Sequence, residues 1–357
     1  MILNSVISLL EKAIEARASL FDARHESAFR LFNGFTEGNP DLVADLYAST
    51  LVIHNYADDP AQGTLFVEQA QQFLRDKLSW LRAGIVKTRN GTPALAGGAR
   101  ETQEERLGQL LFGEKPDTKI KEHGVWYSID LTMHRDASLY LDTRNLRKWL
   151  IEHMQDKTVL NTFAYTGSLG VAALAGGASR VVQHDLNRQF LNVAKTSYTL
   201  NGFHIHKQDF TDSDFFTLVA KFKRTNETFD CVIIDPPFFS ATPKGKVDQV
   251  SERARLINKV RPLINDGGTL IAINNAIYVS GKEYMQTLEA LCKDGYLKIK
   301  ELIPAPEDFT GYPETRVGNP TTDPAPFNHS TKIVILEVKR KKAELRPVKD
   351  GLAQLNR

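Results

Sequence analysis

The sequence of 357 residues contains little cysteine and no long apolar run. Its two cysteines, Cys231 and Cys292, fall in an apolar strand pattern and a helical pattern, which fits a reduced protein without structural disulfides. Neither a CxxC pair nor an HExxH motif occurs, so the sequence predicts no zinc site. No apolar stretch reaches the ~18 residues that span a bilayer. Polar residues interrupt the amphipathic start, Met1–Ala13, unlike a signal peptide, so we expect a cytoplasmic protein without a membrane partner.

A strong charge of either sign is also lacking. The 45 lysines and arginines offset 43 aspartates and glutamates, leaving a net charge of +2, which by itself does not indicate a nucleic-acid ligand. The tail, 341–357, is the exception, because the stretch from Lys339 onward holds seven basic residues against Glu344 and Asp350. Either a solvated chain end or an RNA contact fits this basic tail.

The chain has enough apolar residues, 42% of the sequence, for a large core and two domains. From Thr158 onward, short apolar runs alternate with helical patterns, which is typical of a parallel α/β sheet covered on both faces. Lys332–Val338 is expected to close this sheet as an antiparallel strand. The expected organisation is an N-terminal amphipathic helix at 1–28, a small α+β domain at 29–90, a loop or linker at 91–123, the α/β domain at 124–340 and the basic tail at 341–357.

Within the small domain, apolar spacing predicts the individual elements. Asp41–Tyr47 and Thr50–Tyr56 are expected to be neighbouring strands, and Phe66–Ala83 a helix. Gly91–Gly113 is polar and contains several glycines, so we expect a loop there. Ile120–Leu131 is expected to form a pair of strands. This domain is a candidate for contact with RNA.

Val159–Gly170 has the strand, glycine turn and helix of a nucleotide-binding βα unit. The apolar run ends at Asn161 and turns at Thr166-Gly167 into a helical pattern. Glycine lets the backbone approach a ligand closely, and a helix N-terminus presents unpaired N–H groups to it. Gly167 and Gly170 do not complete the dinucleotide motif GxGxxG, so the turn alone is weak evidence for a nucleotide site and other residues must be considered.

Three aspartates supply that support, because each follows a predicted strand. Asp185 lies eighteen positions beyond the glycine of the turn, close to the ~20-residue spacing at which an acidic residue binds a ribose. Asp209 follows the strand expected at His204–Gln208, where a carboxylate can accept from an adenine amino group. Asp235 ends the next strand and is followed by the rigid Pro236-Pro237. Each aspartate alone fits a helix cap or a turn equally well, but the ordered set indicates a cofactor site.

Three motifs resemble those of the class I S-adenosylmethionine-dependent methyltransferases, namely Asn161–Gly167, Leu141–Arg144 and Asp235–Ser240. More narrowly, they resemble the bacterial large-subunit rRNA methyltransferases that modify cytosine C5 or guanine N7. The resemblance covers Gly124–Val338, and a weaker similarity to the small domain of that family runs over Phe29–Tyr47. It implies a Rossmann-like α/β domain with a mostly parallel sheet, the cofactor S-adenosyl-L-methionine and an RNA partner.

The resemblance also implies roles for individual residues. The motif loop lines the methionine and ribose end of the cofactor, Asp185 holds the ribose, and Asp209 meets the adenine amino group. Arg144 is expected near the cofactor carboxylate or an RNA phosphate, with a helix-surface arginine as the plain alternative. The catalytic edge facing the methyl donor consists of Asp235, Pro236, Pro237 and Phe238. The cofactor-binding set consists of Asn161, Phe163, Ala164, Tyr165, Thr166, Gly167, Asp185, Leu186, Asp209, Asp235 and Arg144.

One departure distinguishes the two branches of that family. Cytosine-C5 transfer needs a cysteine nucleophile, which that branch carries in the loop after the fifth strand, but Ile273–Ile277 contains none. Cys231 lies inside an apolar strand, where we expect it to be buried. The Asp-Pro-Pro-x-Phe-Ser motif and Asn274-Asn275 resemble the guanine-N7 branch. Asp-Pro-Pro-Phe also resembles amino-group methyltransferases, which keeps adenine N6 and guanine N2 open.

The two phenylalanines of this motif are candidates for stacking on a base turned out of its helix. We expect Phe238 or Phe239 to stack and the other to fill the core, with Lys244 and Lys246 following in a loop that could meet phosphate. The sequence therefore predicts methylation of a base nitrogen in RNA, most simply large-subunit rRNA, by direct displacement and without a metal. A protein or small-molecule acceptor, or an inactive RNA-binding assembly factor with this fold, are the alternatives. The oligomeric state stays open.

Overall fold

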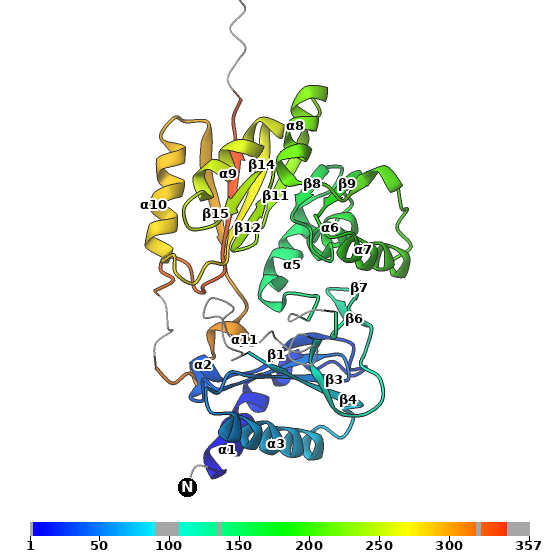
Figure 1. The fold of residues 1–357 in the computed structure, drawn as a ribbon, viewed down its shortest axis with the longest axis vertical. Helices are drawn as coiled ribbons and strands as arrows, with labels where there is room; N and C mark the ends of the chain where they lie inside the picture. Colours follow the sequence, from blue (N-terminus) through cyan, green and yellow to red (C-terminus); the bar gives the residue numbers. More distant parts are fainter. Residues whose placement is uncertain (1–2, 90–106, 134–136, 319–322, 341–357) are drawn as a thin grey trace, which may run out of the picture.

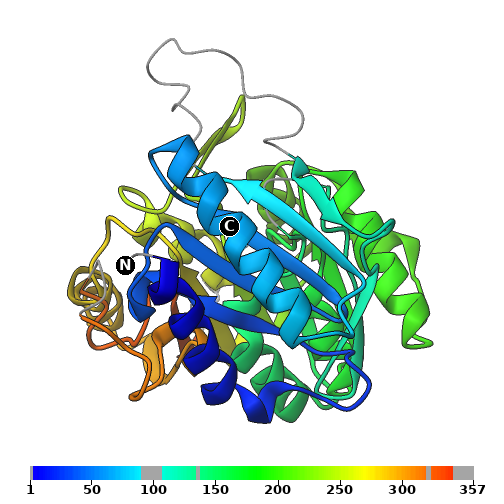
Figure 2. The same cartoon turned by 90° about the horizontal axis from the view of Figure 1, so that it is seen from below.

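The computed structural model describes residues 3–89, 107–133, 137–318 and 323–340, which form two domains stacked along the long axis of the molecule (Figure 1). The N-terminal domain contains a five-stranded sheet with the order β1-β2-β3-β4-β5. Helices α1 and α3 cross one face of this sheet, and the other face is turned toward the second domain (Figures 1 and 2). The elements are α1 (Leu3–Ala16), β1 (Ala28–Asn33), β2 (Leu42–Tyr47), β3 (Thr50–Asn55), α3 (Pro60–Lys77), β4 (Ala83–Thr88) and β5 (Gln109–Phe112).

Helix α1 is part of this domain rather than a separate unit. Its residues Leu10 and Ala13 are fully buried, and they belong to one apolar cluster with Phe32 and Leu74. The two strands expected at 41–47 and 50–56 are confirmed as β2 and β3, which pair antiparallel. Burial of apolar side chains between the sheet and its two helices therefore holds the domain together.

Two expectations for this domain are wrong. The helix expected at 66–83 begins at Pro60 and ends at Lys77, because the Asp59 side chain caps it by accepting a hydrogen bond from the Ala61 N–H at 2.9 Å. The loop or linker expected at 91–123 contains β5. Its end belongs to β6 (Lys119–Glu122), which pairs with β7 (Val125–Ser128) as the two strands expected at 120–131. Strand β5 lies at the edge of the sheet and is half exposed, so its apolar pattern is weak. The rest of that expected linker up to residue 106, and the basic tail 341–357, lie outside the described residues.

The second domain contains a seven-stranded sheet with the order β10-β9-β8-β11-β14-β16-β15. Its strands are β8 (Thr158–Thr162), β9 (Arg180–His184), β10 (Phe210–Thr211), β11 (Phe229–Ile234), β14 (Ile264–Asn274), β15 (Leu297–Ile303) and β16 (Lys332–Val338). The strands from β10 to β14 pair in parallel. Strand β16 runs antiparallel to both of its neighbours, as expected. The topology is that of a Rossmann-like domain whose last strand is reversed.

Helices cover both faces of this sheet. The layers are α5 (Arg144–His153), α6 (Ser168–Ala175) and α7 (Arg188–Leu200) on one side and α8 (Phe215–Thr225), α9 (Arg253–Val260) and α10 (Gly281–Cys292) on the other. In β11, Cys231 and Ile233 pack with the α5 and α6 cluster, whereas Val232 and Ile234 pack with the α8 to α10 cluster. Burial on both faces explains why these strands are continuous apolar runs in the sequence.

Smaller elements complete the structure. Two hairpins pair β6 with β7 and β12 with β13. The remaining elements are α2 (Gly34–Glu37), β7 (Val125–Ser128), β12 (Phe239–Thr242), β13 (Gly245–Asp248), α11 (Glu307–Thr310) and the 3₁₀ turns at Ala18–Leu20, Leu141–Thr143, Lys207–Asp209 and Arg261–Leu263. No helix in the described ranges is long and apolar enough to cross a membrane.

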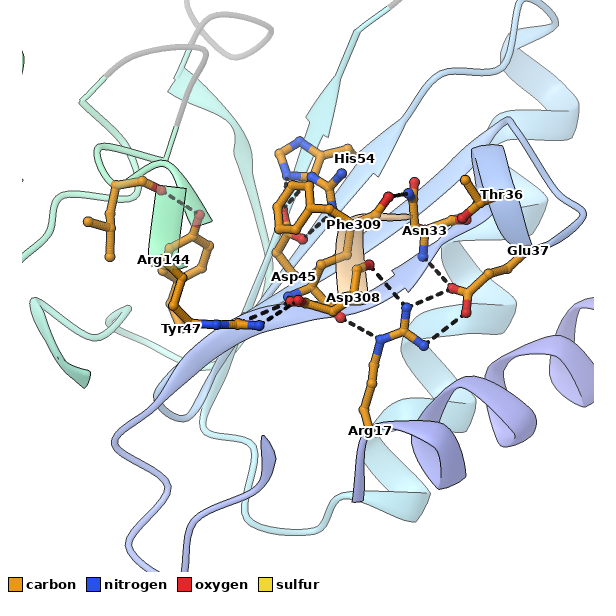
Figure 3. A network of polar contacts seen from close by, with 12 residues as sticks. Arg17, Asn33, Thr36, Glu37, Asp45, Tyr47, His54, Arg144, Asp308 and Phe309 are labelled. Carbon is orange, nitrogen blue, oxygen red and sulfur yellow. Dashed lines mark hydrogen bonds and ion pairs between the residues drawn. The ribbon is translucent and has the colours of Figure 1, made fainter. Parts of the chain in front are cut away.

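A buried polar network joins the two domains through α11 (Figure 3). The Asp308 carboxylate, fully buried, accepts from the Arg144 guanidinium at 2.6 Å and from the Arg30 backbone N–H at 2.9 Å. Arg17, also buried, pairs with Glu37 at 2.9 Å and donates to the Asp308 carbonyl at 3.2 Å. We call these five residues the interdomain clamp. Because every charge in it has a partner of opposite sign or a carbonyl, the clamp fixes the domains against each other.

Candidate active site

A cavity of about 580 Å³ lies at the carboxyl ends of β9 and β11, and we call it the sheet-edge cavity. In a doubly wound sheet this edge is where ligands bind. Seven of the residues expected from the sequence line it, namely Phe163, Tyr165, Asp185, Leu186, Asp235, Pro236 and Pro237. The structure therefore brings together both halves of the expected site, the residues assigned to the cofactor and the Asp-Pro-Pro motif.

Asp185 directly follows β9 and is held in a fixed orientation. One carboxylate oxygen accepts from the Tyr165 backbone N–H and the other from the Asn187 backbone N–H, both at 2.8 Å. Burial raises the pKa of Asp185, although these two hydrogen bonds act in the opposite direction. Each carboxylate oxygen keeps a second lone pair, so Asp185 can accept from a pair of ribose hydroxyls.

The glycine turn before α6 is closely packed against its neighbours. Gly167 has a φ of 77°, and a Cβ added there would lie 2.5 Å from the Ala194 side chain. A Cβ at Gly170 would lie 2.1 Å from Gln183. The two glycines are thus required for close packing of α6 against β9.

Asn161 also lies behind the cavity. It is buried and donates from Nδ2 to Gln183 Oε1 at 2.9 Å, while Gln183 donates to the Gly167 carbonyl at 3.0 Å. Ala164 and Thr166 are buried in the same layer, with the Thr166 hydroxyl donating to the Ser138 carbonyl. These residues of the motif hold the loop that carries Phe163 and Tyr165.

Asp209 does not line the cavity. The third strand is β10, Phe210–Thr211, so Asp209 precedes this strand instead of following it. The Asp209 carboxylate pairs with Arg180, the first residue of β9, at 2.8 Å. The cavity instead contains Ser213 and Asp214, which follow β10.

Asp214 is the acidic residue that the sequence reasoning missed. It caps α8 by accepting from the backbone N–H groups of Phe216 at 2.9 Å and Thr217 at 3.2 Å, and the Thr242 hydroxyl donates to its other oxygen. The signal was present, because an aspartate before an amphipathic helical pattern is a preferred N-cap. Asp214 therefore fixes the start of α8 and the Thr242 side chain at the wall of the cavity.

Asp235 has the most strongly perturbed environment in the cavity. Burial, together with the nearby negative charge of Asp142, raises the pKa of Asp235 from 3.8 to about 7. Its Oδ1 is buried and has no hydrogen-bond partner among the described residues. Because Asp235 also lines the cavity, its carboxyl group is a candidate to meet a donor group of a substrate.

Gln249, which no sequence signal singled out, ties the Asp-Pro-Pro loop to the loop after β14. Its amide nitrogen donates to the Pro236 carbonyl. Its amide oxygen accepts from the backbone N–H groups of Asn275 at 3.0 Å and Ala276 at 3.1 Å. Asn275 lines the cavity, so this single buried side chain sets the distance between two of its walls.

Phe238 and Phe239 both lie outside the core, so the expectation that one fills it is wrong. They are 46% and 56% exposed. Phe238 contacts Tyr278 edge-to-face with ring centroids 6.0 Å apart, and the Lys246 ammonium lies 5.4 Å from the Phe239 ring centroid. Phe238 does not line the sheet-edge cavity. Both rings are free to contact a large substrate at its mouth.

Arg144 does not reach this cavity, in contrast to its expected place near the cofactor carboxylate or a phosphate. Its guanidinium is bound on the other side of the Leu141–Thr143 turn, in the interdomain clamp (Figure 3). The helix-surface alternative is wrong as well, because only 13% of the side chain is exposed. Arg144 is a structural residue that orients the second domain.

The described cavity wall contains no thiol. Cys231, as expected, is fully buried within β11, and burial raises the pKa of its thiol well above the usual range. The loop after β14 continues as Asn275-Ala276-Ile277. No group of three or more side chains with metal-ligating atoms occurs in the described parts of the chain. The site is thus built for binding and positioning, without a cysteine nucleophile.

Comparison with known proteins agrees with this geometry. Residues 52–313 match the S-adenosylmethionine-dependent methyltransferase family, and the chain therefore belongs to that family. The crystal structure of SMU.776 complexed with SAH has a TM-score of 0.79 and 22% sequence identity, over 94% of this chain and 82% of that chain. The SAM-dependent methyltransferase from Agrobacterium tumefaciens has a TM-score of 0.59 over 88% of this chain and 91% of that one, at 16% identity. The fold is that of the class I methyltransferases.

Curated relatives are named for rRNA methylation. A Bacillus subtilis protein, YwbD, whose name assigns it provisionally to the ribosomal RNA large subunit methyltransferases, is 29% identical over 93% of this chain and 80% of its own length. Ribosomal RNA large subunit methyltransferase I of Vibrio cholerae is 31% identical over 74% of this chain. That match spans 65% of the Vibrio protein's own length.

The sheet-edge cavity fits the family's cofactor, S-adenosylmethionine. Its volume lies within the ~300–1,000 Å³ range of small-molecule sites. Asp185 would supply the acceptor for the ribose, and Phe163, Phe190 and Phe215 would supply apolar walls for a flat adenine ring. When bound there, S-adenosylmethionine would supply an activated methyl group. Asp235 lies on the wall of the same cavity.

Proposed function

We propose that the protein transfers the methyl group of S-adenosylmethionine to a base nitrogen of large-subunit rRNA, with guanine N7 as the first candidate. The observation that carries this proposal is the composition of the sheet-edge cavity. Asp235 and the two prolines meet the cofactor residues there, and the described lining contains no thiol. The names of the curated relatives support rRNA as the substrate.

Direct displacement accounts for all atoms and electrons. The nitrogen lone pair forms a bond to the methyl carbon while the carbon–sulfur bond breaks. The electron pair of the broken carbon–sulfur bond stays on sulfur. Guanine N7 has no proton to lose, whereas an exocyclic amino group must release one. Asp235 suits either case, because its carboxylate can accept a hydrogen bond from an amino group and, with a pKa of about 7, can hold a proton near neutrality.

The decisive experiment follows labelled methyl from S-adenosylmethionine into ribosomal RNA, total cellular protein and small metabolites in parallel. Nucleosides from labelled RNA are then identified by mass spectrometry. We expect 7-methylguanosine, and another N-methylated base would retain the chemistry but change the branch. Label in 5-methylcytidine would overturn the thiol-free mechanism.

The alternatives make different predictions in the same experiment. Label confined to protein or metabolites would identify a non-RNA acceptor. Cofactor binding without transfer to any fraction would indicate an RNA-binding or assembly factor. The variant Asp235→Ala serves as the control within the chain, because we expect it to lose turnover while retaining cofactor affinity. An Asp235→Ala protein with full activity would remove this residue from the catalytic edge.

A further inference from the structure

A second cavity, also of about 580 Å³, lies between the two domains, and we call it the interdomain cavity. The N-terminal sheet contributes Arg30, Asp45 and His54 to its wall, and the second domain contributes Asp142 and Ile277. The interdomain clamp borders it, since Arg30 of the clamp lines the cavity, as does Phe309, which directly follows Asp308 (Figure 3). The cavity therefore exists only because the clamp holds the two domains in one arrangement.

The interdomain cavity adjoins the sheet-edge cavity. Tyr140 lines both, with its ring 5.1 Å from that of Tyr165. The loop after β14 also reaches both, through Asn275 on one side and Ile277 on the other. Asp142 lies in the interdomain cavity and is close enough to Asp235 to raise the pKa of that residue. A group bound in the interdomain cavity would thus lie beside the methyl donor.

The walls of the interdomain cavity combine aromatic rings with arginines. Phe35, 37% exposed, contacts Tyr56 edge-to-face with ring centroids 4.9 Å apart. Arg316 is exposed and forms no ion pair with any residue in the described ranges. It lies at the same end as Phe35, because the backbone N–H of Val317 donates to the Thr36 carbonyl at 2.7 Å. Aromatic faces for bases and free guanidinium groups for phosphate are the chemistry that single-stranded nucleic acid requires.

A buried chain of hydrogen bonds orients a further arginine. Arg30 donates to Asp45 at 2.9 Å, and His54 Nε2 lies 3.0 Å from the other oxygen of Asp45. Arg89 donates to His54 Nδ1 at 3.2 Å. Because an arginine can only donate, Nδ1 accepts and the proton of His54 is on Nε2, in the neutral form that burial also favours. The chain ends at Arg89 on the cavity wall.

From these observations we propose that the interdomain cavity is the acceptor site and receives one RNA nucleotide turned out of its helix. The target base lies between Tyr140 and Asp142, with its reacting nitrogen directed toward the methyl donor. Phe35 and Arg316, at the far end, contact the base and phosphate of the flanking nucleotide. This inference rests on the proposed function and identifies the surface that binds its substrate.

Two variants at the far end test the acceptor site without touching the cofactor site. Phe35→Leu keeps an apolar side chain but removes the aromatic face, and Arg316→Gln removes a charge that forms no ion pair. We expect each to raise the KM for RNA by about tenfold, with kcat and S-adenosylmethionine affinity unchanged. Arg316→Gln should also reduce the salt dependence of RNA affinity by about one counterion. Arg24→Gln is the matched control, because Arg24 is exposed and lines neither cavity.

The outcomes separate this inference from the proposed function. If the unaltered protein methylates no RNA, the proposed function fails and the acceptor site fails with it. If the unaltered protein methylates RNA and both variants keep a KM within twofold of Arg24→Gln, the acceptor site alone is overturned. Photo-crosslinking of RNA with 6-thioguanosine at the methylated position gives a second readout on the unaltered chain. Cross-links to Leu139–Asp142 or Asn328–Thr331 would support the site, and cross-links only elsewhere would overturn it.

Discussion

At the scale of single residues, two aspartates next to strands have different surroundings. Asp185 lines the sheet-edge cavity, while Asp209 lies outside it and pairs with Arg180. We expect Asp185→Ala to weaken S-adenosylmethionine binding by ~1–3 kcal/mol, since a hydrogen-bond acceptor is lost from a partly buried site. Asp209→Ala should leave that affinity unchanged. Calorimetric titration of both variants checks this, and equal affinities for Asp185→Ala and the unaltered protein would contradict the ribose assignment.

The raised pKa of Asp235 makes a prediction about stability. Between pH 4 and pH 7 the native state holds a proton on Asp235 that the unfolded state has released, so this residue lowers the free energy of unfolding as pH rises. The loss is at most ~1.4 kcal/mol per unit of pKa shift. Asp235→Asn cannot lose this proton, so it should be more stable than the unaltered protein at pH 8 and similar to it at pH 4. Urea unfolding at the two pH values measures the difference, and parallel pH profiles would contradict it.

The sequence was sufficient to place the residues that directly follow a long buried strand. Asp185 and Asp235 were placed correctly because β9 and β11 are continuous apolar runs. Asp209 was misplaced because β10 has only two residues, too few for a clear pattern. Moving the strand by a few positions places Asp209 before it, and Asp214 after it on the cavity wall. Gln249 had no local signal at all, since its two partners lie in loops that meet only in the folded protein.

At the scale of elements, the glycine turn before α6 separates two effects that glycine has on stability. Gly167 combines a φ of 77° with a Cβ contact of 2.5 Å to Ala194, whereas Gly202 has a φ of 70° and open space around its Cβ. Gly202→Ala should cost ~1–2 kcal/mol for the left-handed backbone alone. Gly167→Ala should cost more, because α6 must also move away from its neighbours. Thermal unfolding of both variants is the measurement, and equal losses would show that packing of α6 is not tight.

Helices and strands could be predicted from the sequence where burial gave the apolar residues a regular spacing. The parallel strands and the reversed β16 follow from unbroken apolar runs between helical patterns. The start of α3 was missed because its first turn carries Gly63, whose hydrogen faces Asn55 closely enough that a Cβ would lie 2.6 Å away. Strand β5 was missed because an edge strand buries less of its surface. Both errors occur where tertiary contacts outweigh local pattern.

At the scale of the whole molecule, stability depends on the interdomain clamp. Asp308→Asn leaves the guanidinium of Arg144, only 13% exposed, without its anion. Breaking a buried ion pair in this way costs ~3–5 kcal/mol. We expect the unfolding transition to move to lower denaturant and to split into two steps as the domains separate. Glu152→Gln, which removes an exposed pair with Lys148 at 3.5 Å, is the control and should change stability by less than ~0.5 kcal/mol. A single unshifted transition for Asp308→Asn would contradict a role for the clamp.

No pattern in the sequence predicts the interdomain clamp. Arg17 and Asp308 are 291 positions apart, and each alone fits an ordinary charged surface residue. Their partners lie on other elements, Glu37 on α2 and Arg144 on α5, so neither helical nor strand periodicity relates them. Domain arrangement is therefore the level at which the sequence was least informative, and the interdomain cavity could not be foreseen from it.

The clamp has a consequence for how a target could be reached. Two domains joined through buried charges resist opening around a folded helix, so in the proposed reaction the motion would come from the RNA. The activation barrier for a paired target then includes the free energy of unpairing it, while an unpaired target avoids that term. Methylation would therefore proceed faster on nucleotides in loops or in RNA that has not yet folded, and the timing of modification would be set by the maturation of the substrate.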